Sequence, residues 1–177
     1  MSARDRLQQL GINLPDLAPT HEFLCVSLIG ELAFVSGHAP FEGGSFRYCG
    51  RVGQDFDLSA GQQAAKLAVL GCLASLEKTV GSLDSIRQIV KLNGYVNCVP
   101  GFHDLPKVTD AASKLLIDLF GDSGRHARTT VGVASLPKGV AVEIELIAAV
   151  TLNLKLLNSH QIGILAKHGS QNGQKFC

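Results

Sequence analysis

Apolar and polar residues alternate in several stretches of this chain, and the period of the alternation changes along it. A period of two is typical of a strand with one buried face, and a period near 3.6 is typical of an amphipathic helix. Strands are predicted at 22–30, 31–36, 90–98, 129–135 and 140–150, with a short edge strand at 46–52. Helices are predicted at 3–10, 59–80 and 104–120.

Residues that begin or end helices mark the limits of the two long ones. Ser59, with Gln62 three residues later, fits a capping box at the start of the first long helix. Asp104 is a suitable cap for the second, and Pro106 is tolerated in its first turn. Glycines at 81 and 121 are expected to end the two helices.

Strands and helices in this order predict an α+β fold, in which one mixed β-sheet is covered by two helices on one face. Residues 1–152 are expected to form a single domain with a short N-terminal helical extension at 3–10. Segment 153–177 mixes Gly with Ser, Asn and Gln and loses its periodicity. We therefore expect it to be a flexible C-terminal tail.

Composition limits the classes of protein that this chain can belong to. Hydrophobic residues make up 46% of its 177 residues and the net charge is only +1, so a nucleic-acid partner is not expected. No apolar run approaches the length of a membrane span, and we expect a cytoplasmic protein without a membrane partner. Five scattered cysteines, in no C-x-x-C spacing, favour reduced thiols, and Cys72 and Cys98 lie on apolar stripes.

Charged residues gather on the two last predicted strands, which are joined by Leu-Pro-Lys-Gly at 136–139. Arg128 begins the first of these strands, and Glu143 and Glu145 share one face of the second. The short turn predicts that the two strands are neighbours, and they can therefore bring one guanidinium near a carboxylate. Two interpretations stay open: a structural ion pair between strands or subunits, or a site where Arg128 binds a carboxylate through two parallel bonds.

Histidines offer weaker alternatives. Ser36 and His38 invite a Ser-His nucleophile, but no G-x-S-x-G motif is present, so His38 is better interpreted as a polar pocket wall or a surface residue. His103 and His126 could form an acid–base pair for RNA cleavage, although the chain lacks the basic groove and stacked aromatics of such sites. No pair of His or Cys has metal-ligand spacing, so no metal site is predicted.

Several motifs together resemble the RidA/YjgF family of reactive intermediate deaminases, also known as L-PSP endoribonucleases. They are Val35-Ser36-Gly37, Arg128 followed by VGVA at 131–134, Leu136-Pro137, and VEIE at 142–145. The resemblance extends from about residue 23 to residue 150. Segments 97–107 and 125–128 are similar to a less-studied branch with an N-terminal extension.

This resemblance implies a chorismate-mutase-like fold and a homotrimer, in which the sheets form a central barrel and sites lie in clefts between subunits. It implies hydrolysis of 2-imino or enamine acids to 2-oxo acids and ammonia, with no metal and no cofactor. The catalytic residues would be Arg128, which clamps the substrate carboxylate, and Glu143, which positions or activates water. The substrate-binding residues that we predict are Phe23, Ser36, Gly37, His38 and Thr130.

Three positions depart from the family pattern. Phe23 replaces a typical Tyr, Thr130 replaces a common Cys, and Pro106 stands near the position of a common Asn. Because part of the polar lining is replaced while the carboxylate clamp is kept, a second hypothesis is a non-catalytic protein that binds small carboxylate metabolites. An endoribonuclease is the third.

Overall fold

The computed structural model describes residues 1–18 and 22–152. Three helices and seven strands follow one another in these residues, with short 3-10 turns between some of them. The helices are α1 (Ala3–Gln9), α2 (Leu58–Val80) and α3 (Leu105–Phe120). The strands are β1 (Val26–Ile29), β2 (Leu32–His38), β3 (Phe41–Glu42), β4 (Ser45–Phe46), β5 (Ile86–Asn97), β6 (Ala127–Val133) and β7 (Val142–Val150).

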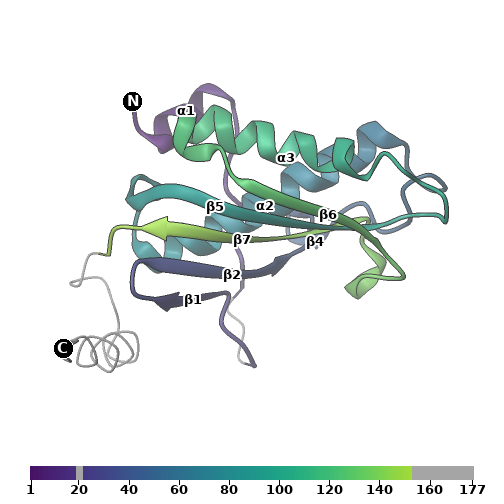
Figure 1. The fold of residues 1–177 in the computed structure, drawn as a ribbon, viewed down its shortest axis with the longest axis horizontal. Helices are drawn as coiled ribbons and strands as arrows, with labels where there is room; N and C mark the ends of the chain where they lie inside the picture. Colours follow the sequence, from purple (N-terminus) through teal and green to yellow (C-terminus); the bar gives the residue numbers. More distant parts are fainter. Residues whose placement is uncertain (19–21, 153–177) are drawn as a thin grey trace, which may run out of the picture.

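Five of the strands form one mixed sheet in the order β1-β2-β7-β5-β6. All neighbours in it are antiparallel except β5 and β6, which run parallel. Helices α2 and α3 pack against each other and against the same sheet, and Figure 1 shows α1 lying beside α3. The predicted α+β class, with two helices on one face of a mixed sheet, is confirmed.

The core lies between the sheet and these two helices. Along β7 the residues facing the helices are buried, and the residues between them, Glu143, Glu145, Ile147 and Ala149, are half-buried. The second face of the sheet, which we call the open face, also carries exposed apolar side chains: Ile29, Leu32, Phe34 and Val131. Residues 1–18 and 22–152 of one copy therefore leave an apolar sheet surface uncovered.

The N-terminal helix is predicted correctly and is part of the core. Ser2 and Asp5 form a capping box at its start, and Leu7 is only 2% exposed. Arg6 Nη1 donates to the carbonyl of Leu119 at 2.7 Å, which ties α1 to the end of α3.

The start of α2 differs from the prediction. Its N-cap is Asp57, whose Oδ1 accepts from the amide of Ala60 at 2.8 Å, so the predicted capping box at Ser59 is wrong. Asp104 precedes α3 as predicted, but its carboxylate pairs with Lys107 and makes no capping bond. Gly81, at a φ of 86°, ends α2 in the left-handed region that favours glycine.

Two predictions about strands are wrong. The predicted edge strand at 46–52 is replaced by a small hairpin of β3 and β4, whose turn residues Gly43 and Gly44 have φ of 59° and 81°. More importantly, β6 and β7 are not neighbours, because β5 lies between them. Segment 136–139 is thus part of a crossover connection.

No helix of the described residues is both long enough and apolar enough to cross a membrane. The predicted tail, 153–177, lies outside the described residues.

Candidate functional site

Glu143 lies on the open face beside an irregularity in β2. Val35 pairs with Leu146 and His38 pairs with Ile144, so β2 holds one more residue here than β7 does, which defines a β-bulge. A Cβ atom at Gly37 would lie 2.2 Å from Glu143 Oε1. Only glycine lets the bulged backbone approach this carboxylate so closely. The structure therefore brings together two of the predicted site residues, Gly37 and Glu143, which we call the open-face half-site.

The surroundings of Glu143 favour its neutral form. Burial raises the pKa of Glu143, and the neighbouring carboxylate of Glu145 raises it further. Glu145 itself is held by two donors: Asn93 Nδ2 at 2.7 Å and the Tyr95 hydroxyl at 3.0 Å. The raised pKa of Glu143 favours a role as proton acceptor, and the carboxylate of Glu145 is engaged with its two donors in the sheet.

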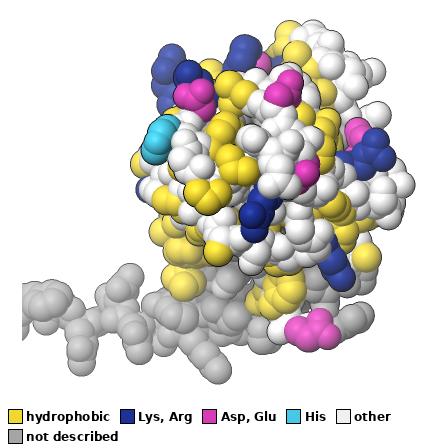
Figure 2. All heavy atoms as spheres, turned by 90° about the vertical axis from the view of Figure 1, so that its right-hand side faces the viewer, with side chains coloured by type: hydrophobic (Ala, Val, Ile, Leu, Met, Phe, Trp, Pro, Cys, Tyr) yellow, Lys and Arg dark blue, Asp and Glu magenta, His cyan; other side chains and the backbone are white. Residues whose placement is uncertain are grey.

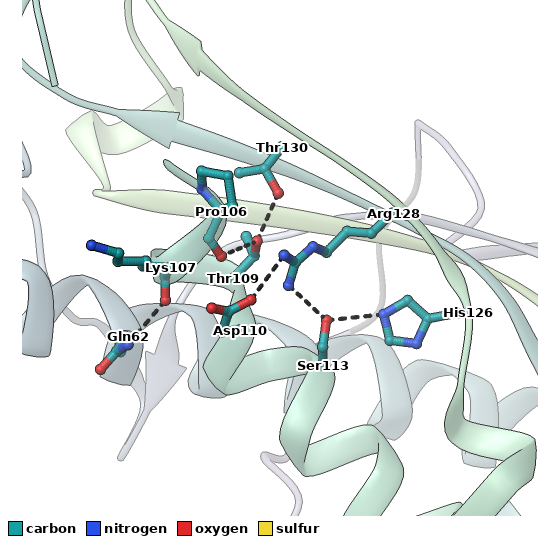
Figure 3. A network of polar contacts seen from close by, with 9 residues as sticks. All are labelled: Gln62, Pro106, Lys107, Thr109, Asp110, Ser113, His126, Arg128 and Thr130. Atoms are coloured by element: carbon teal, nitrogen blue, oxygen red, sulfur yellow. Dashed lines mark hydrogen bonds and ion pairs between the residues drawn. The ribbon is translucent and has the colours of Figure 1, made fainter. Parts of the chain in front are cut away.

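Arg128 faces the other side of the sheet. Its Cα partner on β5 is Leu92, a buried core residue, so the Arg128 side chain extends toward α3. Its Nη2 pairs with Asp110 Oδ1 at 2.8 Å, and its Nη1 donates to Ser113 Oγ at 3.1 Å (Figure 3). The Arg128 side chain is 23% exposed. The guanidinium is therefore fixed at the rim between β6 and α3, within reach of solvent.

Ser113 connects Arg128 to His126. The carbonyl of Gly124 can only accept, so His126 Nδ1, 2.6 Å away, must carry a proton. In the neutral form of His126, Nε2 then accepts a hydrogen bond from the Ser113 hydroxyl at 3.0 Å (Figure 3). Burial lowers the pKa of His126, and the positive charge of Arg128 lowers it as well, against the raising effect of the Gly124 bond. The neutral imidazole thus helps to orient the hydroxyl that holds Arg128.

Thr130 lies on the same side of β6 as Arg128. Thr109 Oγ1, from α3, donates its proton to the carbonyl of Pro106 at 3.2 Å. In the 2.6 Å hydrogen bond between the two threonine hydroxyls, Thr130 is therefore the donor and Thr109 the acceptor. Arg128 and Thr130, with Asp110 and Ser113 from α3, form what we call the helix-side half-site.

The prediction that His38 is a pocket wall or a surface residue is wrong. It is 9% exposed and faces α2, where Nε2 lies 2.7 Å from Ser75 Oγ and Nδ1 lies 2.7 Å from the carbonyl of Ser36. Burial lowers the pKa of His38. His38 is thus neither a surface residue nor a wall of the open-face half-site. It holds the bulge of β2 from the helix side.

Ser36 lies within the bulge, and Phe23 lies in the segment that precedes β1. Ser36 Oγ donates to the carbonyl of Leu24 at 2.7 Å, which engages its hydroxyl in the segment leading to β1. Phe23, in that segment, is 55% exposed.

The predicted pairing of Arg128 with Glu143 does not occur within one chain. Arg128 faces the helices and Glu143 faces the open side, and β5 separates their strands. Asp110 and Ser113 are functional candidates that the sequence analysis missed. Their spacing of three residues places them on one face of a helix, but this signal gains meaning only once β6 is known to lie beside α3.

Other kinds of site find little support in the described residues. No group of three or more His, Cys, Asp or Glu residues is placed to hold a metal ion there. His103 is exposed before α3, whereas His126 contacts Ser113, about 12 Å beyond the first residue of the helix, so the two histidines do not form an acid–base pair. Figure 2 shows cationic and anionic side chains interspersed on the face that it presents. The described residues on that face offer no continuous basic surface for a phosphate backbone.

A cavity of about 840 Å³ opens away from both half-sites. Residues 11–16, the β3–β4 hairpin and the outer faces of α2 and α3 line it. Neither Arg128 nor Glu143 contributes to this cavity.

Comparison with known proteins gives consistent matches along the domain. A family model for "YjgF/chorismate mutase-like, putative endoribonuclease" proteins matches residues 4–150. Protein TCP17 of Trypanosoma cruzi is 38% identical over 149 residues, which are 83% of this chain and 92% of that protein.

Two crystal structures are similar in both sequence and fold. The protein Atu1372 of Agrobacterium tumefaciens, of unknown function, is 38% identical with a TM-score of 0.78, over 84% of this chain and 91% of that one. A "putative endoribonuclease" of Shewanella oneidensis is 32% identical with a TM-score of 0.82, over 85% of this chain and 100% of that one. The matched span of the family model includes both half-sites.

Proposed function

Because this chain belongs to the YjgF/chorismate-mutase-like family, we propose that it hydrolyses 2-imino acids to 2-oxo acids and ammonia in clefts between copies of itself. The observation that carries the proposal is the fixed guanidinium of Arg128 at the rim of β6 and α3. Nη1 donates one of its two protons to Ser113, and Nη2 forms an ion pair with Asp110, so the guanidinium keeps further N–H donors for a ligand. A ligand carboxylate is the group that such a fork binds best.

The cleft needs a second copy of the chain, because the two half-sites face opposite sides of one sheet. The open face supports such an assembly: its exposed apolar side chains would be buried against other copies. Strand β6 is an edge of the sheet, so Arg128 lies where a neighbouring copy can approach. We propose a homotrimer in which the Glu143 carboxylate of one copy meets the Arg128 guanidinium of the next.

The chemistry then requires only positioned groups and one water. Arg128 holds the substrate carboxylate and fixes the adjacent C=N carbon. Glu143 accepts a proton as the water oxygen bonds to that carbon, and the C=N electron pair moves to nitrogen. Glu143 then returns the proton to the nitrogen, and the C–N bond breaks to release ammonia. The hydroxyl oxygen becomes the carbonyl as Glu143 takes its proton and passes it to the ammonia, which leaves as ammonium. An iminium and water give a ketone and ammonium, so atoms and charge balance.

Imine loss tests the reaction directly. An amino-acid oxidase generates 2-imino acids in situ, and their disappearance is timed with and without the purified protein. Wild-type protein should accelerate the loss, and Arg128→Ala should reduce the effect at least about 100-fold because positioning is lost. Arg125→Ala is the matched control, since Arg125 lies three residues away but is exposed and pairs with Asp122. If imine loss is no faster than in buffer for 2-imino acids with several different side chains, the deaminase hypothesis is eliminated.

Assembly is tested separately by light scattering on a sizing column. A trimer should have a mass of about 56 kDa, three times the 18.7 kDa of one chain. Phe34→Asp, on the open face, should shift this mass toward the monomer, because a buried charge destabilises an apolar interface. A monomeric wild-type protein would contradict the shared cleft.

Two other functions have distinct outcomes in the same experiments. A binding protein without turnover would leave imine loss at the buffer rate while Arg128→Ala still weakens binding of a small carboxylate. The endoribonuclease is favoured by one observation, the neutral His126 bonded to Ser113, which resembles a general base. Cleavage of single-stranded RNA that persists in Arg128→Ala and disappears in His126→Ala would support it.

A further inference from the structure

The guanidinium that is expected to bind the substrate carboxylate already has a carboxylate partner in its own chain. Asp110 Oδ1 lies 2.8 Å from Arg128 Nη2, and Asp110 is 58% exposed. We propose that Asp110 makes this site selective for zwitterions: Arg128 binds the carboxylate of the ligand while Asp110 accepts a hydrogen bond from its cationic nitrogen. This inference rests on the proposed function and names its preferred ligand as the protonated imino acid.

Asp110 has the acceptor capacity for this role. A carboxylate offers about four lone-pair positions, and the ion pair with Arg128 involves only one of the two carboxylate oxygens, Oδ1. Because more than half of the Asp110 side chain is exposed, the remaining positions can be reached by a ligand that sits on the rim. Ser113, one helical turn further along α3, holds Nη1 and keeps the guanidinium next to Asp110.

Charge decides which ligands this arrangement favours. A ligand carboxylate on the free side of Arg128 lies within a few ångströms of the Asp110 carboxylate, and the two negative charges repel each other. A simple 2-oxo acid has nothing to offset this repulsion. A protonated 2-imino acid, or a 2-amino acid, carries its positive nitrogen one carbon away from the carboxylate. We expect this difference to be worth about tenfold in affinity at a partly exposed site.

The same charges couple ligand selection to turnover. Asp110 stabilises the C=NH₂⁺ form, which is the electrophile that water attacks, by accepting an N–H hydrogen bond without taking the proton. Once the C–N bond breaks, the nitrogen leaves as ammonium and the product keeps only its carboxylate. The product then faces Asp110 without a compensating charge, so its release is favoured.

The test compares two ligands of equal carbon number on the full-length protein. Isothermal titration calorimetry measures the affinities of alanine, a stable zwitterion, and pyruvate, the corresponding 2-oxo acid. Wild-type protein should bind alanine about tenfold more tightly than pyruvate, and Asp110→Asn should remove or reverse this preference. Asp118→Asn is the matched control: it is on the same helix, about 12 Å further along the axis, and pairs with Lys114.

The outcomes separate this inference from the proposed function. Equal affinities for alanine and pyruvate in the wild type overturn the role of Asp110, and if Arg128→Ala abolishes both, the carboxylate site itself stands. Affinities that do not depend on Arg128 overturn the site and the proposed function with it. If neither ligand binds the wild type, zwitterion selection is also overturned. Should Asp110→Asn fail to fold, the wild-type ratio of affinities decides alone.

Discussion

Gly37→Ala tests whether the bulge of β2 positions Glu143. A Cβ atom at this position would lie 2.2 Å from Glu143 Oε1 and 2.8 Å from its Cδ, whereas ordinary contact begins at 3.4 Å. The carboxylate must therefore move by about 1.2 Å. The clash involves the far end of a flexible, half-buried side chain, so we expect a loss of stability of less than about 1 kcal/mol. Because the φ of Gly37 is not in the left-handed region, an alanine there adds no backbone strain.

The effect on activity should be much larger than the effect on stability. A misplacement of about 1 Å in a positioned catalytic group can cost about 100-fold in rate. Imine hydrolysis by Gly37→Ala should thus fall by about that factor in kcat/KM, while its melting temperature stays close to that of the wild type. Both quantities are measured on the same preparation.

A double-mutant cycle decides whether the loss acts through Glu143. In a Glu143→Gln background, Gly37→Ala should cause little further loss, because the group that it displaces is already inactive. Equal losses in both backgrounds would show that Gly37 acts independently of Glu143. Full activity in Gly37→Ala together with an inactive Glu143→Gln would refute the reasoning that the bulge aligns this carboxylate.

Three further predictions concern protonation and capping. Since burial raises the pKa of Glu143, activity should increase as pH rises through a value above 4.5, and Glu143→Gln should lose this pH dependence and about 100-fold in rate. A carboxyl group with a raised pKa stabilises the fold at low pH, and this stability is lost as pH rises. Glu143→Gln should therefore be more stable to unfolding than the wild type at pH 7. Burial lowers the pKa of His38, so the contribution of this side chain to stability is complete above pH 6.5 and is lost as pH falls toward its pKa in the folded protein. The free energy of unfolding in urea should therefore differ less between pH 5 and pH 7.5 in His38→Gln than in the wild type. An unchanged difference would contradict this. Asp57→Ala should cost about 1 kcal/mol in urea unfolding and Ser59→Ala less than about 0.5 kcal/mol, whereas the reverse order would restore the capping box at Ser59.

The alternation of apolar residues was sufficient to identify the long elements. In β5, Leu92 and Val96 are buried and Asn93 and Tyr95 face the open side, in agreement with the predicted strand at 90–98. Gly81 and Gly121 end both long helices because a helix end needs backbone conformations that glycine adopts easily. These features are local, so a single sequence can specify them.

The neighbours of each strand could not be predicted in this way. Period-two alternation tells which side chains of one strand share a face, but it does not tell which strand lies beside it. Strands β6 and β7 follow each other in the chain, yet β5 inserts between them. This single fact separates Arg128 from Glu143.

The bulge explains the error at His38. Counting in twos from the buried Val35 places Gly37 toward the helices and His38 on the open face. The extra residue in β2 reverses this, so that His38 packs on α2 and Gly37 meets Glu143. A bulge adds one residue to a strand but leaves the alternation of apolar residues on either side of it intact. The pattern of a single sequence therefore gives no sign of where a bulge lies.

Both errors lead to one consequence for function. A continuous β2 with β6 beside β7 would place a complete Arg–Glu site on one chain, and such a protein could act as a monomer. The observed topology instead fixes Arg128 on the helix side, at the edge strand, and Glu143 on the open face. Arg128 is held by its partners on α3, and Glu143 lies against the glycine of the bulge. Activity of the proposed kind must therefore depend on protein concentration wherever the assembly dissociates, and dilution below that point should abolish imine hydrolysis without unfolding the chain.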